Sequence, residues 1–561
     1  MNREAALEKA REALEKGDAS AALEVILSGL EQNPDDPALH HWAGTLRANR
    51  RQYPQARVHL AKALAGFPLD PALWATFGLV LAEIGQRREA EAALRKAADL
   101  DSGGASRLMV LAQFLADGGR IQETVPILEQ VLERSPGLPS AVSGLLAGRL
   151  YDPTRAPVDI AREARAWCAT LEEKVAEMPS PRRDWDPGRR LRVGYLSADF
   201  REHSCAPFIE PLLRAHDRRC VEIQLYHASP LRDGRTEVFQ SLADRWTAVH
   251  ELDDDALAGC FREHQVDVLV DLGGHTAFNR LTVFARRPAP VQVSWLGYPW
   301  TTGLTRLDGR ITDSAVDPPG AEALSSEPLL RIDPCYLCWQ PPAEGPVVGA
   351  APCLLDAPAT FGSFNHFAKL NPAVVEVWSA VMRRTPGSRL LLKGKGAADE
   401  VLRDALVEGF KAGGVAPARI EFLGWSGDAN AHLDLYRRVD VALDPFPYNG
   451  VTTTLEALWM GVPVITLRGP HSLSRQGGAI LDQLRLGEFA VRSPQQYIEV
   501  AAALAADPER VEALRQGLRA SLQRSSICDA PAFAGRMEAL FRRLWASACA
   551  TSCGPAATSH T

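Results

Sequence analysis

The sequence has no excess of positive charge and no long apolar run, and each of these absences excludes a class of protein. Its 561 residues carry a formal net charge of −7, so no basic surface for nucleic acid is expected. No run of about 18 apolar residues occurs, and no basic segment leads into an apolar stretch at the start. We therefore expect a cytoplasmic protein with no signal peptide, no membrane span and no nucleic-acid partner.

Cysteine is also scarce, with 10 residues in the whole chain, which argues against a disulfide framework and fits a reducing compartment. Cys335 and Cys338 form a single CxxC within IDPCYLCW. A structural zinc site would need a second ligand pair, and no clear second CxxC or HxxxH is present. We expect these two cysteines to pack as small apolar side chains, with zinc binding as the alternative, and we predict no metal site.

The N-terminal part of the sequence repeats with a period of 34 residues. Proline or small residues recur at this step: Pro34, Pro68 and Pro136; Ala22, Ala56 and Ala90; Gly44 and Gly78. A further set marks the turn inside each helix pair: Gly17, Gly85 and Gly119, with Arg51 as the departure. Small residues let paired helices approach closely, and proline starts each new unit. This is the tetratricopeptide pattern, and its concave face suits a peptide or a helix. The alternative is an array that only scaffolds or dimerises the protein.

The chain is too long for one core, and three or four domains are expected. We predict the repeat array over residues 1–150, a helical linker over 151–188, and a disordered tail over 546–561. Between linker and tail, strands and helices alternate in two series, 189–345 and 346–545, which predicts two lobes with parallel sheets. The fold class is therefore α followed by α/β. Ligands in such folds bind beyond the carboxyl ends of the strands.

The most informative segment of the second lobe is VDVALDPFPYNGVTTTLEALWMGVPVITL. A strand ends at Asp444, a loop with Asn449 and Gly450 follows, and Thr452 and Thr453 stand where a helix should begin. Free N–H groups and hydroxyls at a helix N-terminus can bind a diphosphate. Ordinary capping of the helix by threonine is the alternative.

Other polar residues of the second lobe fit the same ligand. Asn365, His366 and Lys369 follow a strand within FGSFNHFAKLNP, and a lysine there can neutralise a departing phosphate. Glu456, one turn inside the helix, can accept hydrogen bonds from ribose hydroxyls, and His432 can contact the nucleotide. The alternative for Lys369 and His432 is a solvated surface position.

Two histidines of the first lobe also follow strands. His203, in SADFREHSC, is a candidate base or orienting group for an acceptor, and His275, in DLGGHT, is a second candidate of this type on the acceptor or sugar side. A histidine in a surface turn is the alternative for both.

Together these segments resemble the tetratricopeptide-containing O-linked N-acetylglucosamine transferases and their SPINDLY-type relatives, in a bacterial-type arrangement. The matching segments are SADFREHS, LVDLGGHTAFNRL, RPAPVQVSWLGYPWTTG, RITDSAVDPP, FGSFNHFAKLNP and LDPFPYNGVTTTLEALWMGVPV. The resemblance implies a GT-B architecture of two Rossmann-like lobes. It also implies metal-independent, inverting transfer from UDP-N-acetylglucosamine (UDP-GlcNAc) to Ser or Thr hydroxyls of proteins that the repeats recruit. The donor is a substrate, and no cofactor is expected.

The same resemblance assigns roles to the matching positions. It implies that His203 is the active-site histidine of the acceptor-facing lobe and that Lys369 is the catalytic, phosphate-contacting lysine. Asn365, His366 and His432 fall at nucleotide-contacting positions, Thr452 and Thr453 at the diphosphate site, and Glu456 at the ribose position.

One departure keeps the donor open. Val451 stands where the animal enzymes have a histidine in the phosphate loop, and several segments are closer to the SPINDLY branch, whose plant members use GDP-fucose. A protein O-fucosyltransferase is therefore the first alternative. A weakly catalytic scaffold that senses a nucleotide-sugar is the second.

Overall fold

The computed structural model describes residues 2–101, 103–179, 184–342, 344–355 and 358–553. The chain forms two compact units. Unit 1 consists of Met1–Ala141 with Lys395–Ala405, and unit 2 consists of Val142–Gly394 with Leu406–Thr561. Within the described residues, no helix is long and apolar enough to cross a membrane.

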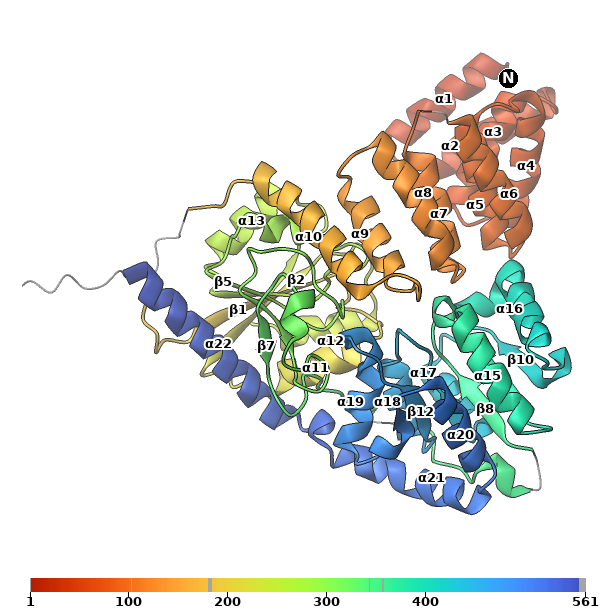
Figure 1. Ribbon diagram of the computed structural model, residues 1–561. Coiled ribbons are helices and arrows are strands. Elements are labelled where there is room, and N and C mark those ends of the chain that lie inside the picture. The colour runs from red at the N-terminus through yellow and green to blue at the C-terminus, as the bar shows by residue number, and fades with distance from the viewer. Residues whose placement is uncertain (1, 102, 180–183, 343, 356–357, 554–561) are drawn as a thin grey trace, which may run out of the picture. The chain divides into compact units, whose positions relative to one another are not determined.

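Unit 1 is an array of antiparallel helix pairs (Figure 1). The helices are α1 (Arg3–Glu15), α2 (Ala19–Gln32), α3 (Pro37–Asn49), α4 (Tyr53–Gly66), α5 (Pro71–Glu83), α6 (Arg87–Leu100), α7 (Ser106–Asp117) and α8 (Ile121–Arg134). Asp36 and Asp70 each cap the helix that follows, with proline as its first residue. The predicted α-helical repeat is therefore confirmed, and the helix pairs that begin with α3 and α5 start with the same local chemistry.

The repeating small residues have a direct steric reason. A Cβ on Gly44 would lie 2.6 Å from Cγ of Leu60, and one on Gly78 would lie 2.8 Å from Cγ of Leu94. Any larger side chain would push the paired helices apart. Arg51, the one departure among the turn glycines, has φ of +58°, in the left-handed region that glycine adopts at the equivalent turns.

The first lobe of unit 2, here called the N-lobe, holds a seven-stranded parallel sheet in the order β3-β2-β1-β4-β5-β6-β7. Its strands are β1 (Leu191–Ser197), β2 (Val221–His227), β3 (Arg245–Ala248), β4 (Val268–Asp271), β5 (Val291–Ser294), β6 (Gly309–Thr312) and β7 (Leu329–Arg331). Helices α11 (Ala206–Ala215), α12 (Gly234–Leu242), α13 (Asp254–Glu263) and α14 (Leu281–Phe284) connect them. The central strands are buried along their length, as a parallel sheet covered on both faces requires.

The second lobe, the C-lobe, holds a six-stranded parallel sheet in the order β10-β9-β8-β11-β12-β13. Its strands are β8 (Thr360–Ser363), β9 (Arg389–Lys393), β10 (Ile420–Leu423), β11 (Val441–Leu443), β12 (Val464–Leu467) and β13 (Ala490–Val491). Its helices include α15 (Pro372–Arg384), α16 (Glu400–Ala412), α17 (Ala429–Asp434), α18 (Thr452–Trp459), α19 (Gln476–Gln483), α20 (Pro494–Ala505) and α21 (Pro508–Gln523). The chain thus has the predicted fold class, helical repeats followed by two Rossmann-like lobes.

The predicted linker is part of the N-lobe instead of a spacer. Unit 2 begins at Val142, so most of α9 (Pro139–Arg149) and all of α10 (Pro157–Lys174) belong to it. Cys168 of α10 is fully buried in the N-lobe core. Glu172 accepts hydrogen bonds from the backbone N–H and the hydroxyl of Thr305, at 2.9 and 2.7 Å. The sequence indicated a helix here but not its buried face.

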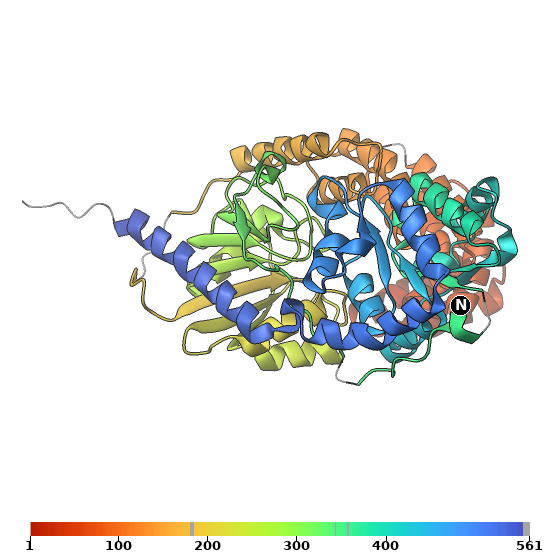
Figure 2. The same ribbon diagram turned by 60° about the horizontal axis from the view of Figure 1, so that its bottom comes forward.

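The predicted tail is also partly wrong, because α22 (Ala530–Cys553) continues through residues 546–553. This last helix returns to the N-lobe, beside its strands in both ribbon views (Figures 1 and 2). Trp545 Nε1 donates to the carbonyl of Asp186 at 3.1 Å, and Glu538 accepts from His216 at 2.8 Å. The rest of the predicted tail, 554–561, lies outside the described residues.

The CxxC cysteines are both buried, with Cys335 2% and Cys338 0% exposed. Burial raises the pKa of the Cys338 thiol to about 12. Both side chains therefore lie in the packed environment that an apolar role requires.

Candidate functional site

The carboxyl ends of neighbouring strands of the C-lobe bring the predicted residues together. β8 and β11 are paired in parallel, so the chain leaves both strands at the same edge of the sheet. Asn365, His366 and Lys369 follow β8, and Lys369 closes a short 3-10 turn, η3 (Phe367–Lys369), before α15. The loop after β11 leads from Asp444 to α18, which begins at Thr452.

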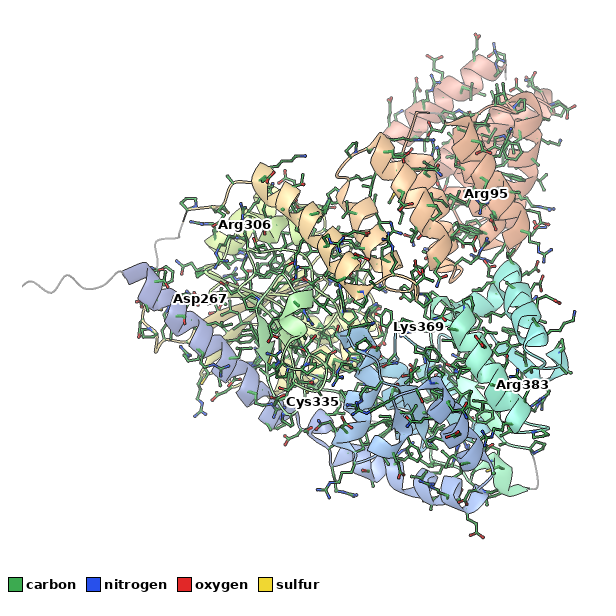
Figure 3. All side chains as sticks on the ribbon, viewed as in Figure 1. Arg95, Asp267, Arg306, Cys335, Lys369 and Arg383 are labelled. Atoms are coloured by element: carbon green, nitrogen blue, oxygen red, sulfur yellow. The ribbon has the colours of Figure 1, made fainter. Side chains whose placement is uncertain are left out.

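Lys369, labelled in Figure 3, is half-buried and contacts the loop that precedes α18. Its Nζ donates to the carbonyl of Asn449 at 2.8 Å and to Asn365 Oδ1 at 3.4 Å. The same amine lies 4.2 Å from the ring centroid of Tyr448, within cation–π range. Burial lowers the pKa of Lys369, and the charge of Asp444 opposes that shift. The amine is thus held in place, partly desolvated, beside a helix N-terminus.

The start of α18 is arranged differently from an ordinary capped helix. The N-cap is Val451, and no side chain caps the helix. Thr453 donates instead to Asn365 Oδ1 at 3.1 Å, while Thr452 donates to the Ser204 carbonyl of the N-lobe at 3.5 Å. Asn365 accepts from both Thr453 and Lys369, so it ties the two predicted phosphate-binding elements together. The alternative of simple capping by threonine is not what the structure has.

His432 and Glu456 form a second group near the same edge. His432 Nε2 donates to Glu456 Oε2 at 3.1 Å, and His432 Nδ1 accepts from Lys393 at 2.6 Å. A carboxylate only accepts and an ammonium only donates, so these partners make Nε2 the donor and Nδ1 the acceptor of the ring. The ring of Phe364 lies 5.8 Å from that of His432. Trp425, 64% exposed, lies 5.3 Å from the Lys393 amine. The group thus combines aromatic rings, which can stack on a base, with the Glu456 carboxylate, which can accept hydrogen bonds from ribose hydroxyls. These are the features that a nucleoside site needs.

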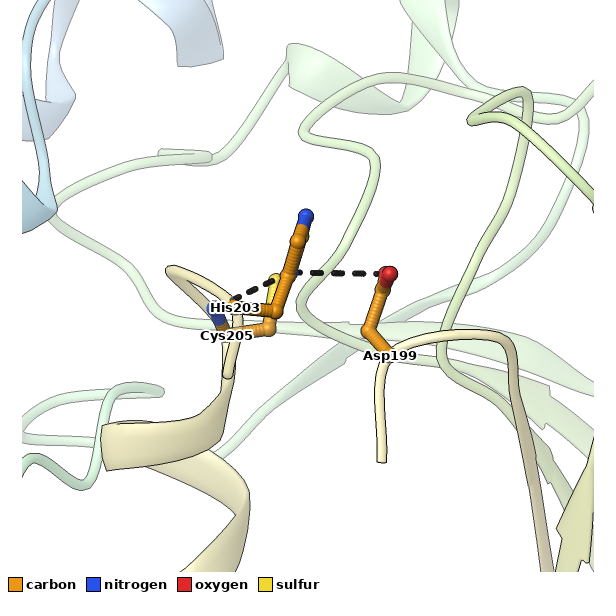
Figure 4. Close-up of side chains that lie close together, drawn as sticks. All are labelled: Asp199, His203 and Cys205. Atoms are coloured by element: carbon orange, nitrogen blue, oxygen red, sulfur yellow. Dashed lines mark hydrogen bonds and ion pairs between the residues drawn. The ribbon is translucent and has the colours of Figure 1, made fainter. Parts of the chain in front are cut away.

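His203 of the N-lobe is held by a nearby carboxylate (Figure 4). Its Nδ1 lies 3.5 Å from Asp199 Oδ2 and 3.3 Å from the backbone nitrogen of Cys205. A proton on Nδ1 donates to the carboxylate and leaves Nε2 as the acceptor. Asp199, His203 and Cys205 form the one His/Cys/Asp/Glu group with metal-ligand proximity that the described part of the chain contains. Burial and the charge of Asp199 raise the pKa of the Cys205 thiol to about 12. We interpret Asp199 as orienting His203, because its carboxylate lies within ion-pair distance of the ring.

His275 does not join either group. It is 2% exposed, its Nε2 donates to the Thr302 carbonyl at 2.8 Å, and its Nδ1 accepts from the Ser143 hydroxyl at 2.9 Å. Burial lowers the pKa of His275 to about 4, so the ring is neutral. Through Nδ1 the ring joins α9 to the N-lobe, and through Nε2 it binds within the N-lobe. The acceptor- or sugar-side role stays a prediction, and both ring nitrogens already bind groups of the protein.

Sequence reasoning missed residues whose role depends on distant neighbours. Asp444 was recognised only as the end of a strand, although it faces Lys369. Lys393, at the end of β9, contacts His432, and no role was assigned to it from the sequence. Tyr151, assigned to the linker, lies with its ring 5.1 Å from that of Tyr448. The position of Lys393 at a carboxyl strand end was the one available signal.

A cavity of about 500 Å³ lies elsewhere in the C-lobe. Its lining includes Thr360, Arg389 and Glu421, from the amino ends of β8, β9 and β10. Ligands in parallel α/β sheets bind at the opposite edge. The predicted site around Lys369 lies at that opposite edge, where the chain leaves β8 and β11.

Comparisons with known proteins show which family and which fold the chain resembles. The model of the family described as glycosyl transferase family 41 matches residues 160–337 and 352–537. The SPINDLY protein of Arabidopsis thaliana, named a probable UDP-N-acetylglucosamine–peptide N-acetylglucosaminyltransferase, is 37% identical over 368 residues, which are 65% of this chain and 40% of the relative. The SEC protein of the same plant, with the same description, is 30% identical over 411 residues, 70% of this chain and 42% of the relative.

One solved structure matches nearly the whole chain. It is a mutant of the Thermobaculum terrenum O-GlcNAc transferase, 34% identical, with a TM-score of 0.81 and 98% of both chains covered. The chain spans about 40% of the length of the curated SPINDLY relatives it matches.

Proposed function

The chain belongs to glycosyl transferase family 41, and from this premise we propose that it transfers N-acetylglucosamine from UDP-GlcNAc to Ser or Thr hydroxyls of proteins. The observation that carries the proposal is the position of Lys369. Its amine lies against the loop that leads into the N-terminus of α18, with Asn365 bound to both. A cation and a helix N-terminus that meet at one point suit the diphosphate of a nucleotide-sugar.

In the proposed reaction, the acceptor hydroxyl oxygen forms a bond to the anomeric carbon while the bond from that carbon to the diphosphate oxygen breaks. The departing diphosphate takes the electron pair, and Lys369 with the first turn of α18 stabilises the charge that develops on it. The hydroxyl proton passes to a base. His203 is the candidate group on the acceptor side, because Asp199 orients its ring and its N-lobe segment meets α18 through the contact between Ser204 and Thr452.

The nucleoside half of the donor fits the group around His432. Glu456 can accept from ribose hydroxyls, and the exposed ring of Trp425 offers a stacking surface for a base. In this proposal Lys369, the threonines and the helix N-terminus supply the positive environment for the diphosphate, so the reaction is metal-independent.

The acceptor is proposed to be a protein or peptide that the repeat array of unit 1 recruits. Stacked helix pairs form an extended concave surface, which suits such a ligand. The relatives' names describe peptide glycosyltransferases, in agreement with an acceptor of this class.

A second donor, GDP-fucose, is favoured by one observation. Val451 is the N-cap of α18, and it offers no donor to phosphate where a histidine would. The experiment that separates the two donors is calorimetric titration of the full chain with UDP, GDP, UDP-GlcNAc and GDP-fucose. The proposal expects binding of UDP and UDP-GlcNAc. Tighter binding of GDP and GDP-fucose would make GDP-fucose the donor in place of UDP-GlcNAc. Binding of a nucleotide-sugar without any transfer would favour a scaffold that only senses the nucleotide-sugar.

A further inference from the structure

The peptide bond between Asn449 and Gly450 lies between a carboxylate and the Lys369 amine. Its N–H donates to Asp444 Oδ1 at 2.7 Å, and its carbonyl accepts from Lys369 Nζ at 2.8 Å. An anion at the donor end and a cation at the acceptor end polarise the same amide, so each hydrogen bond strengthens the other. The two charges are thus coupled through the loop that leads into α18.

Asp444 is fixed in position. Its side chain is 1% exposed, and Oδ2 accepts from the Thr466 hydroxyl at 2.7 Å. The glycines around it leave no room for movement: a Cβ on Gly450 would lie 3.0 Å from Oδ1, and one on Gly477 would lie 2.6 Å from Oδ2. Burying a carboxylate costs free energy unless it is paired and hydrogen-bonded. The proposed transfer reaction assigns no role to Asp444, so its burial calls for another explanation.

We propose that Asp444 is a positioning residue for Lys369, which holds the 445–450 loop against the amine through the Asn449–Gly450 peptide and keeps that amine protonated. One part of this proposal rests on the proposed function, namely that the protonated amine binds the leaving diphosphate. The coupling between Asp444 and Lys369 is independent of that function, because all of its partners belong to the protein.

The other titratable groups around Lys369 do not replace Asp444 in this role. Burial raises the pKa of Tyr151 to about 12 and raises that of Tyr448 well above its ordinary value, so both rings are neutral. His366 precedes η3 and is exposed. Its effect on the pKa of Lys369 can be measured with the His366→Gln variant. Burial raises the pKa of Asp444 and lowers that of Lys369, and the charge of each group opposes the shift of the other. Each group therefore favours the charged form of its partner.

The test measures the pKa of the Lys369 amine directly. The full chain is labelled with trace acetic anhydride over a range of pH, and mass spectrometry gives the extent of acetylation at Lys369, since only the neutral amine reacts. In Asp444→Asn the side chain keeps its shape and its acceptor for Gly450 N–H but loses its charge. The labelling midpoint should move to lower pH by about one unit or more, the size typical of one nearby opposite charge. An unchanged midpoint would overturn the proposal.

Matched variants separate charge from packing. Thr454→Val removes a hydrogen bond to the carbonyl of the same Gly450 without changing any charge, and its midpoint should stay at the unmodified value, as should that of His366→Gln. Thr466→Val removes a donor that favours the ionised form of Asp444, so its midpoint should move in the same direction by less. If Asp444→Asn fails to fold, Thr466→Val decides: a shift to lower pH supports the coupling, and no shift refutes it.

Activity adds a second, separable readout. In Asp444→Asn, kcat should fall at and above neutral pH and recover as the pH is lowered, because the amine regains its proton. Damage to the fold would not recover in this way. If the unmodified protein binds no nucleoside diphosphate and transfers no sugar, the proposed function fails, whereas the labelling result still decides the role of Asp444.

Discussion

Replacing Lys369 by alanine separates catalysis from stability more sharply than any other single change. The substitution removes the hydrogen bonds to Asn449 and Asn365 and the cation beside the N-terminus of α18. Loss of one stabiliser of developing charge typically costs roughly 10²–10³ in rate, and we expect a loss of that size in kcat.

The stability of this variant should change little. Burial lowers the pKa of Lys369, so between its folded and unfolded pKa values the unfolded chain binds more protons, and stability rises with pH across that window. At neutral pH the charged amine therefore costs folding free energy. Its removal offsets the lost contacts. Asp444, whose pKa burial already raises, can take up a proton in the variant, so no unpaired charge stays buried. The unfolding free energy should therefore change by about 1 kcal/mol or less.

The assay is transfer at saturating donor, followed by mass spectrometry of the acceptor, with thermal unfolding measured on the same samples. Lys411→Ala, which removes an exposed lysine of α16 paired with Glu408, is the control and should match the unmodified chain in both measurements. Near-normal turnover of Lys369→Ala would refute the assigned role. A large loss of stability would show instead that the lysine is structural.

Three further predictions address the metal, the repeats and the donor loop. EDTA should leave transfer unchanged, because the diphosphate charge is assigned to Lys369 and a helix N-terminus; inhibition reversed by Mg²⁺ or Mn²⁺ would contradict this. Deleting residues 1–140 should weaken transfer to whole proteins far more than it weakens nucleotide binding in calorimetry, and an equal loss of both would make the array a structural support. Val451→His should tighten UDP binding by about 1 kcal/mol, the size of one added hydrogen bond to a charged group, and should affect GDP less; calorimetry that finds no gain for UDP would remove Val451 from the donor site.

Features that depend on nearby residues could be predicted from the sequence. The step of 34 residues located the repeats, since Gly44 and Gly78 are small for the same steric reason in two successive helix pairs. The run from Asp444 to Glu456 predicted a strand, a loop and a helix N-terminus, because each has its own local residue preferences. Lys369 and Asn365 could be assigned to the same edge because they directly follow a strand.

Features that depend on distant partners could not be predicted in this way. His275 follows a glycine-rich loop like a catalytic residue, but Ser143, which occupies its Nδ1, lies 132 positions earlier in the chain. The last residues of α22 read as a tail because nothing local indicates that Trp545 packs against 186–189. The coupling of Asp444 to Lys369 depends on the geometry of one peptide bond, which residue types alone do not specify.

The central claim is tested most directly by incubating the full chain with UDP-GlcNAc or GDP-fucose and a library of Ser- and Thr-containing peptides, then identifying the modified residues by mass spectrometry. The account predicts N-acetylhexosamine on Ser or Thr side chains with UDP-GlcNAc, and loss of this product in Lys369→Ala. Deoxyhexose from GDP-fucose alone would contradict the donor, and the absence of product with both donors would contradict the reaction itself.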